Sequence, residues 1–97
     1  MRHFYRCQTA PADVLVSADR FFSELGLTLV STTARTRSLT GALGSMKLIV
    51  KVEGGHYTFV EVTTDQMGES RMDRNVKKFF LQLHRAEDPT HMLEASY

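Results

Sequence analysis

The sequence has one cysteine, two prolines, no tryptophan and no excess of charge of either sign. Cys7 stands alone, which excludes an intramolecular disulfide and a cysteine-based zinc site. No apolar run approaches the roughly 20 residues that cross a bilayer. The residues after Met1 carry charges and no apolar segment, so we expect no signal peptide and a cytoplasmic protein.

The chain has 97 residues, 42% of them hydrophobic, a size and composition typical of a single globular domain. We expect one domain over residues 1–88 and a C-terminal tail over residues 89–97, where no periodicity is visible. The formal net charge of +1 argues against nucleic-acid binding through bulk charge alone. A locally basic face stays possible, because charge can be unevenly distributed.

The first elements are predicted to be a strand and a helix. Residues 3–8 are rich in aromatics and predict a short strand. The helix is expected from Pro11 to Leu25, with Gly26 as its stop. Its apolar residues recur at the spacing of one helical face: Val14, Leu15, Ala18, Phe21, Phe22 and Leu25. The opposite face is acidic.

The middle of the chain is β-like and predicts a meander of strands. Residues 32–38 fit either an edge strand or a loop. Gly54-Gly55 predicts a two-residue turn. That turn would place Val52 opposite Tyr57 and Leu48 opposite Glu61 on the inward face. Glu61 would then lie among apolar neighbours, as a strand-end residue reaching solvent or as the sign of a shifted register.

In this register the outer face of the sheet carries an apolar patch. We expect this patch to be either an interface with a partner protein or a second copy of the chain, or a surface that the flanking strands and the C-terminal tail cover. The candidate interface residues are Ile49, Val60 and Val62.

A second helix is predicted to begin at Ser70, which forms a capping pair with Asp73, and to end before Asp88-Pro89. Its apolar stripe consists of Met72, Val76, Phe79, Phe80 and Leu83. The expected fold class is α+β, a two-layer sandwich of order β-α-β-β-β-α. Both helices would pack on one face of a four-stranded, mainly antiparallel sheet.

The titratable residues do not predict an enzyme, a cofactor or a metal site. Cys7 and His3 would lie about 13 Å apart along one strand, too far for a nucleophile and its base. The histidines have no metal-binding spacing and are interpreted as surface residues: His3, His56, His84 and His91.

Basic residues dominate the second helix, with five Lys or Arg and one acid between Ser70 and Arg85. This pattern is typical of a solvated helix face, or of a surface for an anionic lipid headgroup, nucleic acid or acidic protein. The candidate anion-binding residues are Arg71, Arg74, Lys78 and Arg85, with Arg35 and Arg37, which share one face of any strand there.

Residues 4–87 resemble the kinase-associated domain found at the C-terminus of several Ser/Thr protein kinases, a β-α-β-β-β-α module. The resemblance lies in "FYRCQTAPADVL", Leu25-Gly26, the Val60–Val62 strand, and Gly68-Glu69 leading into "VKKFFLQL". It implies a non-catalytic domain that binds anionic phospholipids or a partner surface. The spacing from Gly68 to the two phenylalanines is about one turn longer than in that family.

Residues 11–86 also contain the α-β-β-β-α order of the double-stranded-RNA-binding domain. Lys77-Lys78 lie further into the last helix than that family's signature, and the first helix is acidic, although shape recognition of RNA needs contacts from it.

The leading functional hypothesis is a small non-catalytic binding or regulatory module. It would contact an anionic partner through the basic face of the last helix, self-associate through the open sheet face, or do both. One alternative is an RNA-binding module. Another is a protein that holds an apolar small molecule between helices and sheet, in a pocket lined by Phe21, Phe22, Phe79 and Phe80.

Overall fold

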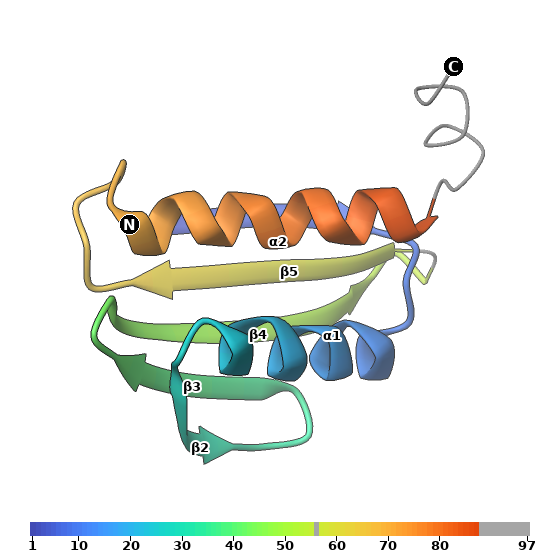
Figure 1. Cartoon of the computed structure of the whole chain (residues 1–97). Helices are drawn as coiled ribbons and strands as arrows, with labels where there is room; N and C mark the ends of the chain where they lie inside the picture. The colour runs from blue at the N-terminus through green and yellow to red at the C-terminus, as the bar shows by residue number, and fades with distance from the viewer. Residues whose placement is uncertain (56, 88–97) are drawn as a thin grey trace.

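The computed structural model describes residues 1–55 and 57–87, which fold into one sheet covered by helices on one side (Figure 1). The predicted tail at 89–97 lies outside the described residues, as do His56, Asp88-Pro89 and His91. The elements, in chain order, are β1 (Arg2–Cys7), α1 (Pro11–Glu24), β2 (Thr28–Thr32), β3 (Thr36–Gly41), β4 (Gly44–Glu53), β5 (Tyr57–Thr64) and α2 (Arg71–Glu87).

The strands form an antiparallel sheet in the order β1-β5-β4-β3-β2. The helix α1 packs on β4 and β3, and α2 packs on β1 and β5 beside it (Figure 1). The predicted α+β class, with two helices on one face of an antiparallel sheet, is confirmed. The expected strand number was wrong, since the described sheet has five strands.

A tight turn at Thr33–Arg35 accounts for the additional strand. The Thr33 hydroxyl accepts hydrogen bonds from the backbone N–H groups of Arg35 and Thr36, at 3.2 and 3.1 Å. This side-chain turn reverses the chain. The ambiguous segment 32–38 is therefore the end of β2, a turn and the start of β3.

Both helices begin or end at the residues that the sequence indicates. Pro11 occupies the first turn of α1, and Gly26 follows its end with φ +88°, where glycine is favoured. The Leu27 N–H donates to the carbonyl of Phe22 at 3.0 Å and closes the end of α1. At α2, the Ser70 hydroxyl accepts from the Asp73 N–H at 3.1 Å and donates to the Asp73 carboxylate at 2.7 Å.

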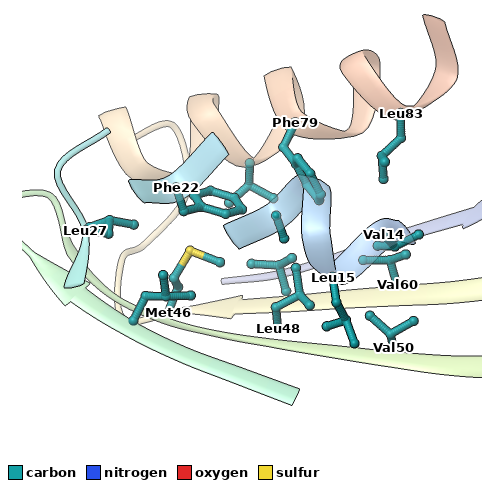
Figure 2. Close-up of a cluster of buried hydrophobic side chains, with 14 of the residues drawn as sticks. Val14, Leu15, Phe22, Leu27, Met46, Leu48, Val50, Val60, Phe79 and Leu83 are labelled. Atoms are coloured by element: carbon teal, nitrogen blue, oxygen red, sulfur yellow. The ribbon is translucent and has the colours of Figure 1, made fainter. Parts of the chain in front are cut away.

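The core lies between the helices and the sheet, where Phe22 of α1 and Phe79 of α2 meet with ring centroids 5.2 Å apart (Figure 2). Both rings are fully buried. Phe80 departs from the predicted stripe, because it is only partly buried and stacks on Tyr5 at 5.3 Å. The aromatic side chains expected to line a ligand pocket therefore pack on one another or on the sheet.

The pairing of β4 with β5 differs from the prediction by one residue. Glu53 pairs with Tyr57, and Val52 with Thr58, which leaves residues 54–56 between the strands instead of the two expected glycines. Because side chains alternate along a strand, a shift of one residue exchanges the two faces of β5. Val60 and Val62 are fully buried under the helices, so their assignment to an open interface was wrong. Ile49 remains on the outer face and is partly buried.

Candidate binding surface

The face of the sheet that points away from the helices is not covered by any helix or strand in the described part of the chain. We call it the uncovered face. Along β1 the side chains of Arg2, Phe4 and Arg6 point to it, while the alternate residues point toward the helices. The other strands contribute Thr36, Ser38 and Thr40 of β3, Ser45, Lys47, Ile49, Lys51 and Glu53 of β4, and Tyr57, Phe59, Glu61 and Thr63 of β5.

Aromatic rings lie exposed on the β1–β5 half of the uncovered face. Phe4 and Phe59 stack with centroids 5.5 Å apart and an interplanar angle of 26°. Phe4 is 50% exposed and Tyr57 is 49% exposed. Exposed aromatic clusters are typical of contact surfaces, which makes this part of the sheet a candidate one.

Arginine side chains cover the two stacked rings. The guanidinium carbon of Arg2 lies 5.1 Å from the centre of the Phe4 ring, and that of Arg6 lies 4.9 Å from the centre of Phe59. Both distances are within the range of cation–π attraction. The rings and the guanidinium planes therefore form one layered cluster.

The acidic groups of the uncovered face are both held by these arginines. Arg2 Nε donates to Glu61 at 3.1 Å, and Arg6 Nε donates to Glu53 at 2.8 Å. Lys47 and Lys51 are exposed and form no ion pair with any residue that the structure describes. The described residues of the face carry four cationic side chains against two anionic ones, so its net charge is positive.

A hollow of about 390 Å³ continues the surface over β3 and β4. Side-chain hydroxyls dominate its polar lining, and Thr40 and Ser45 hydrogen-bond each other at 2.9 Å. Asp65 lies at its rim, where hydrogen bonds from the Gln66 side chain and the Ser45 N–H lower the pKa of its carboxyl group. The hollow therefore offers hydroxyl donors and a carboxylate acceptor next to Lys47.

Four of the predicted anion-binding residues lie exposed along α2: Arg71, Arg74, Lys78 and Arg85. Their spacing places them on one side of the helix. Arg74 Nε donates to the Glu69 carbonyl at 3.1 Å. None of the four forms an ion pair with a side chain in the ranges 1–55 and 57–86. We call them the α2 basic face; it lies in the helical layer, away from the uncovered face (Figure 1).

Arg35 and Arg37 lie elsewhere and do not join the α2 basic face. They border a cavity of about 610 Å³ with Val16 and Val52, beside the start of α1. Arg37 Nε donates to Asp19 at 3.0 Å, so its charge is already balanced by α1. Arg35 belongs to the turn before β3 rather than to a strand shared with Arg37.

A buried polar network joins β1, β5 and α2 at Asp73. One carboxylate oxygen lies 2.8 Å from His3 Nε2 and accepts from the Thr64 hydroxyl at 2.8 Å. The other accepts from the Gly68 N–H at 3.0 Å and from the Ser70 hydroxyl at 2.7 Å. Burial opposes ionisation of Asp73, but the hydrogen bonds from His3, Ser70 and Thr64 outweigh it and hold its pKa well below the usual range.

The interpretation of His3 as a surface residue was therefore wrong, because only 8% of it is exposed. The Ser70 hydroxyl donates its hydrogen bond to Asp73 and not to the His3 imidazole. Ser70, His3 and Asp73 therefore lack the arrangement in which a histidine activates a nucleophile. Its contacts instead connect α2 to both strands beneath it.

Residues 1–55 and 57–87 contain no group of three or more His, Cys, Asp or Glu side chains that could hold a metal ion. Within the same part of the chain, neither helix is long and apolar enough to cross a membrane. No protein-family model matches the chain, and no curated protein matches it. The resemblance to the kinase-associated domain stays a prediction.

The sequence interpretation missed the aromatic cluster because of the register error. The sequence contained two signals for it. Along β1, Arg2, Phe4 and Arg6 alternate with residues whose side chains are buried or partly buried. In the predicted register, the charged side chain of Glu61 lay among apolar residues on the inward face. In the observed register Glu61 lies outside, paired with Arg2.

Proposed function

We propose that this protein is a small non-catalytic binding module whose binding surface is the uncovered face. The observation that carries the proposal is that Phe4 and Tyr57 are each about half exposed on a sheet face that no described element covers. Exposed aromatic side chains are enriched where proteins bind partners. The excess of cations around them favours an anionic partner.

A non-catalytic role is supported by the condition of the titratable groups that meet inside the protein. The His3–Asp73 pair is buried and both carboxylate oxygens are occupied by donors from the protein. An acid–base group needs access to a substrate. This network is explained by its connection of α2 to the sheet.

The α2 basic face is a second candidate surface, because its exposed cations are not neutralised by acids of the described residues. Leu81, 46% exposed, lies near Lys78 and Arg85 in a shallow cavity. This combination of apolar and basic groups fits an anionic membrane surface or an acidic protein.

A pair of charge-reversal variants separates the two surfaces. Lys47→Glu/Lys51→Glu changes only the uncovered face, and Arg74→Glu/Lys78→Glu changes only the α2 basic face. The parent and both variants would be compared for binding to a single-stranded oligonucleotide, anionic vesicles and an acidic peptide, and for self-association by sedimentation. The proposal expects the first variant to lose a partner that the second retains. Loss confined to the α2 variant, or background binding throughout, would reject the uncovered face as the binding surface.

A further inference from the structure

The uncovered face places flat rings, cations and hydroxyls side by side on one rigid sheet. We propose that it binds single-stranded nucleic acid, with bases stacked on its exposed rings and phosphates held by its cations. This inference rests on the proposed function and adds the chemistry of the partner.

The half-exposed rings, with the Arg2 and Arg6 guanidinium groups over Phe4 and Phe59, offer flat surfaces on which bases can stack. Phe4 and Tyr57 are each about half exposed, on neighbouring strands. Every base has a flat face, so stacking on aromatic side chains is tolerant of sequence, and loss of one such contact weakens binding about 5- to 150-fold. Bases inside a duplex are already stacked and cannot reach the rings, so the single strand is the expected ligand.

The cations lie in two rows across the strands. Cross-strand pairing aligns Arg2, Thr63 and Lys47 in one row and Arg6, Phe59 and Lys51 in the other. The rows are four residues apart along each strand, which corresponds to about 13 Å. Phe4, Glu61 and Ile49 lie between them. A chain crossing the face can therefore place phosphates at either row, one base over Phe4 between the rows, and another over Tyr57, which lies beyond the second row.

The hollow over β3 and β4 offers the polar contacts that such a chain needs beyond the rings. Ser38 and one member of the hydrogen-bonded pair Thr40 and Ser45 present hydroxyls that can donate to phosphate or sugar oxygens. The Asp65 carboxylate at the rim can accept from a base amino group or from a ribose hydroxyl. RNA and DNA share the phosphate and base chemistry, and the ribose hydroxyl would give RNA one additional donor.

A second copy of the chain fits this surface less well. A face-to-face dimer would bring together two faces on which Lys47 and Lys51 have no acidic partner among the described residues. Glu61 and Glu53 could not neutralise these lysines, because they already form ion pairs with Arg2 and Arg6. A lipid surface also fits less well, because Glu61 and the cations are interspersed among the rings rather than placed around an apolar centre. Charge complementarity therefore favours a polyanion that also carries flat rings.

The test uses the full chain with fluorescent 12-nucleotide oligo(U), oligo(dT) and a duplex of equal length at two salt concentrations. We expect the single strands to bind more tightly than the duplex, with affinity falling as salt rises. Phe4→Ala and Tyr57→Ala should each weaken single-strand binding at least about fivefold. Both side chains are about half exposed, so both variants should keep the parent's circular dichroism spectrum and stay folded at the assay temperature, with at most a modest fall in melting temperature. Val16→Ala is the matched control and should bind as the parent does, because Val16 is an exposed apolar residue of α1 that belongs to neither candidate surface.

Three results would overturn the inference: background binding of both single strands, equal or tighter binding of the duplex, or unchanged affinity in both alanine variants. Vesicle binding and sedimentation of the same variants show whether the proposed function falls as well. If Phe4→Ala abolishes vesicle binding or self-association while oligonucleotides do not bind, the uncovered face remains a binding surface with a different partner. If no partner responds to the sheet variants, both proposals are rejected.

Discussion

His3 Nε2 lies 2.8 Å from the buried carboxylate of Asp73, although the two residues are 70 positions apart in the chain. The contact joins the edge strand β1 to the first turn of α2. Asp73 therefore has two roles, since it also forms the capping pair with Ser70.

Replacing Asp73 by alanine should destabilise the protein more than the loss of a helix cap does. A cap contributes about 1 kcal/mol, whereas removing Asp73 also leaves the buried donors of His3 and Thr64 without their acceptor. We expect a loss of about 3 kcal/mol or more in the free energy of unfolding. Urea titration measures it, with Asp13→Ala in the first turn of α1 as the exposed control. Equal losses in the two variants would contradict this role.

Acid should remove the contribution of Asp73 to stability. Its pKa in the folded protein is held below the value of about 3.9 expected for an unfolded chain. The contribution is therefore fully present above about pH 4 to 5 and is lost as the pH falls further. Asp73→Asn cannot titrate, so the gap in unfolding free energy between parent and variant should narrow from pH 5 to pH 3. A constant gap over this range would show that Asp73 is not the acid-sensitive group.

The register of β4 and β5 can be tested by placing lysine at adjacent positions. Val62 is fully buried and Thr63 is exposed. Val62→Lys should therefore abolish or severely weaken folding, because it buries an unpaired charge. Thr63→Lys should change the free energy of unfolding by no more than about 0.5 kcal/mol. Thermal melts of the two variants measure the difference, and the register with Val62 outside predicts the reverse order.

The two phenylalanines that share the predicted helical stripes should not be equivalent. Phe22→Ala removes a fully buried ring and should cost about 3 to 5 kcal/mol. Phe80→Ala should cost about half as much, because Phe80 is only partly buried against Tyr5. Denaturant unfolding of both variants provides the comparison. Similar losses would mean that Phe80 contributes more than its burial indicates.

The elements that local patterns determine were predictable from the sequence. The stripe of α1 and its stop at Gly26 were confirmed, as was the Ser70–Asp73 pair of α2. Each depends on residues within a few positions of one another. The fold class followed, because two such stripes need one sheet face to cover.

The features that were missed depend on contacts between distant residues. The length of the connection between β4 and β5 decides which face of the sheet carries Phe59. Gly54-Gly55 predicted a connection one residue shorter than the observed one. The burial of His3 depends on Asp73, which no local pattern connects to it. The predicted interface therefore shares only Ile49 with the uncovered face, because its β5 residues were assigned to the wrong side of the sheet. The exposure of the α2 basic face followed directly from helical spacing.

The pairing of the first strand with the last has a consequence for the order of folding. β2 to β5 are neighbours both in sequence and in space, so their hairpins close short loops. β1 pairs with β5 only by closing a loop of about 50 residues, which costs more chain entropy, so we predict that β1 joins the sheet after these hairpins. The His3–Asp73 contact would then form late, after the folding barrier. Weakening this contact should chiefly increase the unfolding rate and leave the folding rate nearly unchanged. The His3–Asp73 contact would therefore lengthen the time that the protein stays folded.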